Sequence, residues 1–226
     1  VDMAKLGADF GYTMDGARRG SMEDETFSAD GARVIIEGVS AHPGYAKGSL
    51  ENAVKIAAEI IATLPKDRLS PETTADREGF IHPLEIKGIA EQAQIDFIIR
   101  DFTGSQLVKH AAVIQAAIDE VAPRFPKSKI RLETYEQYRN MKEILDQHPH
   151  VVELAEKAIV AAGLTLRKGS IRGGTDGSRL SYMGLPCPNI FTGEHAFHGK
   201  YEWVSVQDME KAAEVIVRIV SLAAGD

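Results

Sequence analysis

Three short segments combine glycine with side chains that are able to bind a metal ion. These segments are Tyr12–Gly16, Ser40–Gly44 and His195–Lys200. Asp15 precedes a glycine, a pattern that is typical of a turn. His42 precedes a proline, which favours an extended backbone and displays the imidazole from its loop. His195 and His198 are three residues apart and could bind a metal together, although no third ligand lies near them in the sequence. The local patterns leave a functional and a structural interpretation open for each of these side chains.

A glycine-rich loop, Arg172–Gly177, offers several backbone N–H groups just before an expected helix start. Such a turn is a natural cradle for an anion or for a developing oxyanion. The loop lacks the Gly-Lys-Ser/Thr ending of a phosphate-binding loop, and the chain has no Gly-x-Ser-x-Gly nucleophile elbow. Arg172 and Arg179 lie beside it and would add positive charge. A plain tight turn is the alternative that this pattern leaves open.

The periodicity of apolar residues predicts the elements that must position these groups. The central expected elements are a strand over 33–39, a helix over 50–64, strands over 80–86 and 94–101, a helix over 107–121 and a strand over 129–136. The order β-α-β-β-α-β is the ferredoxin-like arrangement of a small antiparallel sheet with two helices on one face. We expect this unit over residues 28–137.

The flanking segments have a different, more α/β character. Residues 6–26 are Gly-rich and charged, and they enter the turn at Asp15 through Phe10 and Tyr12. On the other side we expect a helix over 151–162, a short strand over 189–192 and a final helix capped by Ser205. We therefore predict that the α+β unit interrupts a second domain formed by residues 1–27 and 138–226.

Composition excludes several classes of protein. The 226 residues include 33 acidic and 26 basic side chains and carry a net charge of -7, which argues against sequence-independent nucleic-acid binding. No window approaches the roughly 18 apolar residues of a membrane helix, and no signal peptide is apparent. The single Cys187 has no partner for an internal disulfide and favours a reducing cytoplasm. The chain begins with Val1 rather than Met, so its N-terminus is expected to be a cut end.

Eight motifs, spread over essentially the whole chain, occur in a characteristic order. They are Tyr12–Gly16, Ala41–Gly48, Ile99–Phe102, Tyr138–Met141, His148–His150, Ile171–Gly177, Gly184–Asn189 and Phe197–Glu202. Together they resemble the peptidase T family, the tripeptide aminopeptidases among the co-catalytic di-zinc exopeptidases related to aminoacylases. The resemblance implies an α+β ferredoxin-like lid domain inserted in part of an α/β zinc-exopeptidase catalytic domain.

The resemblance also implies roles for individual residues. Asp15 would be a ligand of one zinc ion and His198 a ligand of the other. His42, on the lid, would hydrogen-bond the oxyanion that forms from the substrate carbonyl, and in dimeric relatives the equivalent histidine reaches the partner's active site. The residues implied to hold a small peptide substrate are Arg100, Asn140, Arg172, Gly174, Thr175 and Asp176.

The sequence also departs from the family. The N-terminal half of such proteins supplies a His-x-Asp ligand pair, a bridging Asp and a Glu-Glu pair that contains the general base. None of these is assignable here, because His82 is followed by Pro83 and Leu84 and the chain contains no Glu-Glu dipeptide. We therefore expect a C-terminal portion that is inactive alone. Its expected partners are the missing N-terminal half and a second copy of the chain in a homodimer.

Two other functions stay open at this point. The ferredoxin-like unit could serve as a non-catalytic dimerisation or peptide-binding module. The complete protein could also be a neighbouring di-zinc enzyme, such as a dipeptidase or an aminoacylase.

Overall fold

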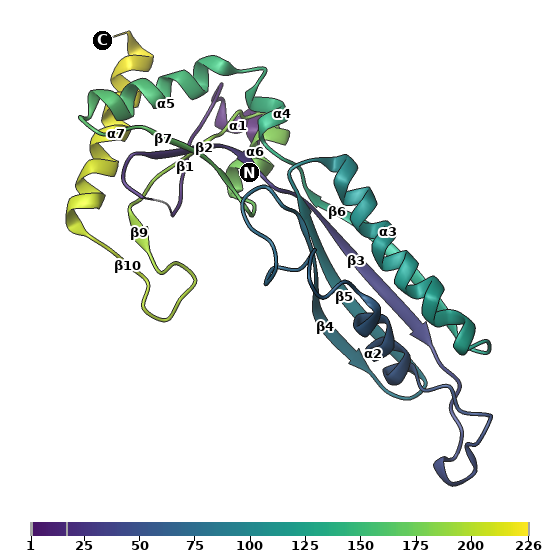
Figure 1. The fold of residues 1–226 in the computed structure, drawn as a ribbon. Helices are drawn as coiled ribbons and strands as arrows, with labels where there is room; N and C mark the ends of the chain where they lie inside the picture. Colours follow the sequence, from purple (N-terminus) through teal and green to yellow (C-terminus); the bar gives the residue numbers. More distant parts are fainter. Residues whose placement is uncertain (1, 17, 226) are drawn as a thin grey trace. The chain divides into compact units, whose positions relative to one another are not determined.

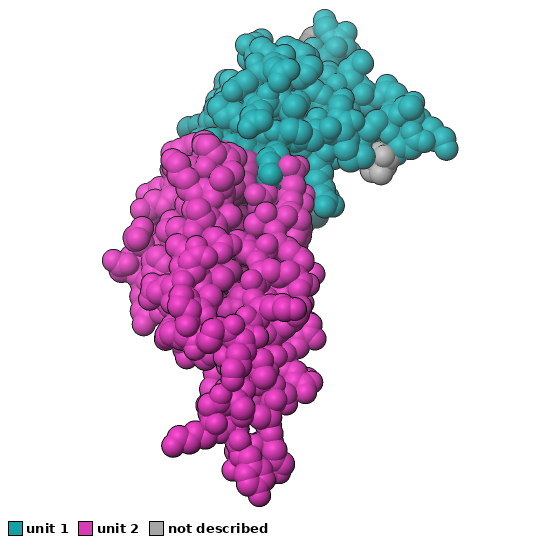
Figure 2. All heavy atoms as spheres, turned by 90° about the vertical axis from the view of Figure 1, so that its right-hand side faces the viewer, with its two compact units in different colours: residues 1–27, 138–226 teal, residues 28–137 magenta. Residues whose placement is uncertain are grey.

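The computed structural model describes residues 2–16 and 18–225 and divides the chain into two compact units (Figures 1 and 2). Unit 1 consists of residues 1–27 and 138–226, and unit 2 of residues 28–137. Each unit has a hydrophobic core of its own.

Unit 2 is built on a four-stranded sheet with the order β4-β5-β3-β6 (Figure 1). The strands are β3 (Ser28–Glu37), β4 (Phe80–Gly88), β5 (Gln92–Asp101) and β6 (Lys129–Tyr138). β5 pairs antiparallel with both β3 and β4. The helices α2 (Ala53–Thr63) and α3 (Gly104–Val121) lie between strands in the sequence, as do two short 3-10 turns, η1 (Pro43–Tyr45) and η2 (Ala122–Arg124). The sequence therefore runs strand, helix, two strands, helix, strand.

The core of unit 2 explains why the apolar periodicity located its elements. Ile95, Phe97 and Ile99 alternate along β5 and are all buried, and they pack with buried residues of α2 and α3. The bounds differ from those expected by a few residues. β3 begins at Ser28, five residues earlier than expected, because the polar and small residues at its start are paired with β5. α2 begins at Ala53 because the Asn52 side chain accepts hydrogen bonds from the backbone N–H groups of Val54 and Lys55 in the first turn of the helix.

Unit 1 is built on a mixed sheet with the order β1-β8-β2-β7. The strands are β1 (Thr13–Met14), β2 (Ser21–Thr26), β7 (Arg167–Ile171) and β8 (Asn189–Ile190). β1 is parallel to β8, β2 is parallel to β7, and β2 is antiparallel to β8. A small hairpin, β9 (Glu194–His195) and β10 (Trp203–Val204), follows β8.

The helices of unit 1 include two long ones that pack on each other and supply much of its core. They are α5 (Pro149–Ala161) and α7 (Val206–Ala224). Three shorter helices are α1 (Met3–Leu6), α4 (Lys142–Leu145) and α6 (Asp176–Tyr182). The expected cap of the last helix is confirmed, since the Ser205 hydroxyl accepts a hydrogen bond from the Asp208 N–H at 3.0 Å. Within the described part of the chain, no helix combines the length and the apolar character needed to cross a bilayer.

β2 and β7 are two strands that the sequence patterns did not predict. β2 carries the polar sequence Ser-Met-Glu-Asp-Glu-Thr, and its register with β7 shifts between Glu23 and Glu25. The four consecutive residues 21–24 are all buried, Glu23 and Asp24 among them, so this part of the strand is covered on both faces. The Asp24 carboxylate is paired with the Lys168 ammonium of β7 at 3.0 Å. Buried acidic side chains, one of them paired with a lysine of the neighbouring strand, therefore replace the apolar alternation that normally marks a strand.

Candidate active site

A cavity of about 560 Å³ in unit 1 is bordered by the ends of several sheet strands. Residues from β2, from β8, from the turn after β1, from β7 with the glycine-rich loop and from the β9–β10 loop line it. The lining includes five residues that the sequence singled out: Asp15, Arg172, Gly174, Thr175 and His198. Segments far apart in the sequence therefore meet at one site, as the shared sheet requires.

Asn189 organises the end of β1 at this cavity. Its side-chain amide donates to the Asp15 backbone carbonyl at 2.9 Å and to the Glu23 carboxylate at 2.9 Å. Its side-chain oxygen accepts a hydrogen bond from the Thr13 hydroxyl at 3.0 Å. Asp15 is thus positioned through its backbone. Within the described residues, the Asp15 carboxylate makes no hydrogen bond or ion pair of its own, so its oxygens are available to a ligand.

Glu23 is a cavity residue that the sequence analysis missed. Its side chain is almost fully buried, with 7% of the residue exposed. Burial raises the pKa of Glu23, the negative charge of Asp15 raises it further, and the hydrogen bond from Asn189 opposes both effects. Glu23 lies in the polar strand β2, which no periodicity marked. No sequence motif identified Glu23 as a cavity residue. It is recognised only because the fold brings it close to Asp15.

The glycine-rich loop connects β7 to α6 along the cavity wall. A side chain at Gly174 would place its Cβ 2.6 Å from Cζ of Tyr138, so any other residue here would force the Tyr138 ring or the loop to shift. The Arg172 guanidinium lies over the Phe27 ring at 5.2 Å. The Thr175 hydroxyl is buried and has no hydrogen-bond partner among the described residues. A buried hydroxyl without a partner is costly, which favours a polar ligand at this position.

The loop that carries His198 is held by its own hairpin. The His198 backbone N–H donates to the Glu202 carboxylate at 2.7 Å, and His198 has a left-handed backbone with φ of 61°. A hydrogen bond with the Glu194 carboxyl lowers the pKa of Glu202, and the same contact raises the pKa of Glu194. His195 stacks on Trp203 with ring centroids 4.3 Å apart. His195 therefore supports the hairpin, while His198 lines the cavity.

Two further candidate residues of unit 1 do not line this cavity. Asn140 is buried, and its side-chain oxygen accepts hydrogen bonds from the Thr26 N–H at 3.0 Å and the Lys142 N–H at 2.9 Å. These contacts join the end of β2 to the start of α4. Asp176 is exposed at the first position of α6.

The remaining candidates, His42 and Arg100, belong to unit 2. His42 is exposed before η1, and its Nδ1 accepts a hydrogen bond from the Gly44 N–H at 3.1 Å. In the neutral imidazole this contact places the proton on Nε2, which leaves that nitrogen as a donor. Arg100 is half-buried on β5, where its guanidinium donates to the Ile99 carbonyl at 2.9 Å.

The described residues do not make a complete metal centre. In residues 2–16 and 18–225, no three His, Cys, Asp or Glu side chains are grouped so that they could hold a metal ion. A catalytic Zn²⁺ site normally takes three protein ligands. Asp15 and His198 therefore fit only part of such a site, and no chemical step through a metal follows from this chain alone.

Comparison with known proteins shows which family the chain resembles. Residues 25–126 match the peptidase dimerisation domain. Peptidase T of Halothermothrix orenii is 44% identical over 220 residues, which are 97% of this chain and 54% of that protein. Peptidase T of Geobacillus kaustophilus is 44% identical over 221 residues, which are 98% of this chain and 54% of that protein. The chain thus spans about half the length of the curated relatives it matches.

Solved structures show the same fold. An aminopeptidase from Bacillus cereus matches with a TM-score of 0.78 at 24% identity, covering 99% of this chain and 60% of that chain. A tripeptidase from Staphylococcus aureus matches with a TM-score of 0.83 at 19% identity, covering 100% and 60%. A dinuclear metal-binding peptidase from Bacillus subtilis matches with a TM-score of 0.64 at 11% identity, covering 98% and 60%. The family expected from the sequence motifs is confirmed: over the part of these proteins that it spans, the chain belongs to the peptidase T family.

Proposed function

We propose that the chain is part of a zinc-dependent aminopeptidase that releases the N-terminal residue of tripeptides. The observation that carries this proposal is the 44% identity to peptidase T over 97% of the chain. In this proposal unit 2 is a ferredoxin-like lid and dimerisation domain, and unit 1 is the C-terminal part of an α/β catalytic domain. Since the chain spans 54% of that relative, the rest of the catalytic domain would come from residues outside the matched part.

Asp15 and His198 are the proposed metal ligands, one for each of two zinc ions. Both line the same cavity, and Asp15 keeps its carboxylate unpaired among the described residues. Paired metals of this kind, when bound, polarise a peptide carbonyl and ionise a bridging water. The other ligands and the general base would lie outside this chain, because its described residues contain no complete cluster.

The remaining candidates are proposed to hold the peptide. Arg172, Gly174 and Thr175 line the cavity and offer a guanidinium, a close backbone approach and a buried hydroxyl without a partner. A guanidinium suits a substrate carboxylate because it can donate two parallel hydrogen bonds. Arg100, Asn140 and Asp176 would assist in binding the peptide. His42 would donate from Nε2 to the oxyanion that forms from the substrate carbonyl.

A second copy of the chain is the proposed partner of unit 2. Residues 25–126 match the peptidase dimerisation domain, and β4 is an edge strand of the sheet in this unit. Leu84 and Ile86 on that strand are 62% and 46% exposed, so this edge offers apolar side chains to a partner. We also propose the cytoplasm as the compartment, because the lone Cys187 is a buried free thiol.

The activity proposal is tested by comparing the 226-residue chain with a chimera. The chimera joins the chain to the segment of Halothermothrix orenii peptidase T that it does not span. We expect the chain alone to retain no stoichiometric zinc and to hydrolyse no tripeptide, and the chimera to do both. Asp15→Asn and His198→Gln in the chimera should lower hydrolysis more than about 100-fold, the upper range for losing a residue that only supports a ligand. His195→Gln is the matched control, since this residue stacks on Trp203.

Other outcomes of these experiments would support one of the alternative functions. Stoichiometric zinc with turnover by the 226-residue chain would contradict the proposal. A zinc-loaded chimera that prefers dipeptides or N-acyl amino acids would indicate a related di-zinc enzyme. The incomplete ligand set favours one second candidate, a non-catalytic dimerisation or peptide-binding module. A folded chimera without any peptidase activity would support that module.

A further inference from the structure

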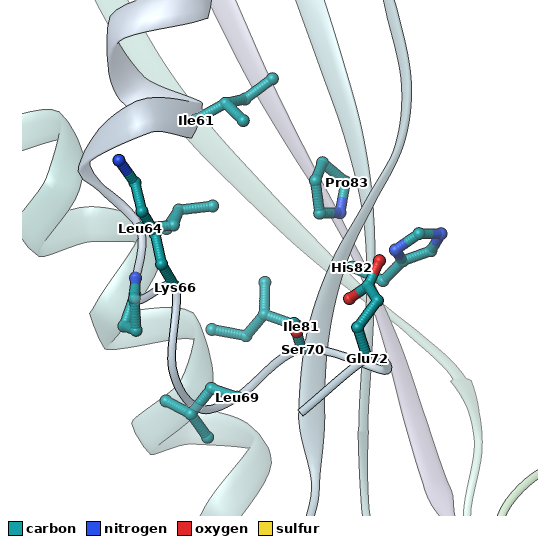
Figure 3. A pocket seen from close by; sticks show the side chains of 10 residues that line it. Ile61, Leu64, Lys66, Leu69, Ser70, Glu72, Ile81, His82 and Pro83 are labelled. Atoms are coloured by element: carbon teal, nitrogen blue, oxygen red, sulfur yellow. The ribbon is translucent and has the colours of Figure 1, made fainter. Parts of the chain in front are cut away.

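A buried charge distinguishes the cavity of unit 1 from a second cavity, which lies in unit 2. The second cavity, of about 300 Å³, lies between the end of α2 and the start of β4, and its charged lining residues Lys66 and Glu72 are exposed to solvent (Figure 3). The unit 1 cavity is lined by Glu23, of which only 7% is exposed. Taking a carboxylate out of water is costly, and a positive group facing the charge offsets this cost.

The charge of Glu23 is not balanced within the part of the chain that the structure describes. One carboxylate oxygen accepts a hydrogen bond from the neutral Asn189 amide at 2.9 Å. Glu23 makes no ion pair with any described lysine, arginine or histidine. Asp15, a neighbouring carboxylate, repels this charge rather than balancing it. An ionised Glu23 is therefore suited to a positively charged group of a ligand in the cavity.

Asn189 limits the distance between Glu23 and the proposed metal ligand Asp15. The same amide nitrogen donates to the Asp15 backbone carbonyl and to the Glu23 carboxylate, each at 2.9 Å. These two oxygens are therefore no further apart than the two hydrogen bonds placed end to end. In an aminopeptidase substrate, one carbon atom separates the α-ammonium nitrogen from the reacting carbonyl, so a group that binds the ammonium must lie beside the metal ligands. Glu23 meets this requirement.

Arg172, which carries a positive charge in the same lining, lies further along the sheet. β2 and β7 are parallel, and Glu23 is paired with Gly169. Arg172 follows Gly169 by three residues, which is about 10 Å along an extended strand. Its guanidinium lies over the Phe27 ring, beyond the end of β2. A fully extended tripeptide also spans about 10 Å, so the spacing of these opposite charges matches the two ends of a tripeptide.

We propose that Glu23 binds the α-ammonium group of the peptide and thereby selects substrates with a free N-terminus. This inference rests on the proposed aminopeptidase function and adds a specificity-determining residue to that site. The C-terminal carboxylate of a tripeptide would lie at Arg172, and the carbonyl of its first residue would lie beside Asp15. A metal ion is the other cation to consider. In residues 2–16 and 18–225, however, no three His, Cys, Asp or Glu side chains, Glu23 included, are grouped so that they could hold one.

Binding is tested on the 226-residue chain, without metal and without catalysis. The ¹⁵N-labelled chain is titrated with trialanine and with propionyl-alanyl-alanine, which has a hydrogen atom in place of the ammonium group. The side-chain amide signals of Asn189 report on the site, because this amide donates to Glu23. We expect saturable shifts of these signals with trialanine. Propionyl-alanyl-alanine should bind at least about tenfold more weakly, as for the loss of a hydrogen bond to a charged group.

Glu23→Gln removes the charge and keeps the shape of the side chain, since its amide oxygen can still accept from Asn189. This variant should bind trialanine about tenfold more weakly and propionyl-alanyl-alanine with unchanged affinity. Glu25→Gln, a change on the same strand outside the lining, is the matched control and should bind trialanine as the unmodified chain does. In the chimera, Glu23→Gln should lower kcat/KM for trialanine by the same factor and leave the zinc content unchanged.

Equal affinity of the unmodified chain for the two peptides would overturn this inference, as would the absence of saturable shifts. A folded Glu23→Gln chain that binds trialanine as tightly as the unmodified chain would show that Glu23 is only structural. Loss of zinc from the Glu23→Gln chimera would assign the carboxylate to a metal ion instead. An inactive unmodified chimera would contradict the proposed function, whereas the peptide titrations measure no catalysis and test Glu23 separately.

Discussion

Asn189 and Glu23 show how polar residues fix the geometry of the unit 1 cavity. Asn189 uses both halves of its side-chain amide, accepting from Thr13 and donating to Asp15 and Glu23. These bonds join β1, β2 and β8 at one point, so they hold the backbone of Asp15 while its carboxylate stays available. Motifs in the sequence included both Asp15 and Asn189, but the contact between them and the presence of Glu23 beside them become visible only once the strands are paired.

Gly174 gives a residue-level prediction about the glycine-rich loop. Gly174→Ala should destabilise unit 1 by about 1–3 kcal/mol, because the new Cβ would lie 2.6 Å from the Tyr138 ring and either the ring or the loop would have to move. Urea denaturation followed by circular dichroism measures the loss. Gly173→Ala is the matched control, since its Cβ would come no closer than 3.9 Å to another side chain. Equal stability of the two variants would show that the loop does not need the close approach.

At the level of elements, apolar periodicity predicted the strands and helices that pack on an apolar core. It missed the strands that are held by polar contacts. The alternation of Ile95, Phe97 and Ile99 located β5, and the Ser205 cap located the start of α7. β2 escaped prediction because its buried positions include Glu23 and Asp24, and β7 because its residues are exposed or half-buried; Asp24 is paired with Lys168 across the strands. This pairing depends on residues more than 140 positions apart, so no local pattern contains it. For the same reason, no local sequence pattern identified Glu23 as a cavity residue.

The start of α7 gives an element-level prediction about pH. A hydrogen bond from the Ser205 hydroxyl and the neighbouring Arg19 guanidinium lower the pKa of Asp208. The stability that this carboxylate contributes is therefore complete above its unfolded pKa of about 3.9 and is lost as the pH falls through the lower folded pKa. Asp208→Asn should lower the free energy of unfolding at pH 7, and the difference from the unmodified chain should shrink below about pH 3.

Urea denaturation at several pH values measures this effect. Glu210→Gln, an exposed change on the same helix, is the control and should leave the pH dependence of stability unchanged. A difference between Asp208→Asn and the unmodified chain that is the same at pH 7 and pH 2.5 would exclude a contribution from the ionised carboxylate.

At the level of the whole molecule, the two units differ in how the chain builds them. Unit 2 is one continuous segment, residues 28–137, whereas unit 1 is assembled from two segments that lie on either side of it in the sequence. The core of unit 2 is formed entirely by residues of that segment. The residues that unit 2 needs in order to fold therefore all lie in that segment. Unit 1 needs both of its segments before β1, β2, β7 and β8 can pair.

Residues 28–137 should consequently fold alone and unfold in a single cooperative transition. Ile95→Ala should destabilise the isolated segment by about 2–5 kcal/mol, because Ile95 is fully buried and its loss leaves a cavity in the core. Ile86→Ala, at a side chain that is 46% exposed on the edge strand, should cost less than about 1 kcal/mol. Urea denaturation of the segment and of the 226-residue chain measures both changes. A broad transition in the segment, or equal losses for the two variants, would show that the core of unit 2 is completed by residues outside it.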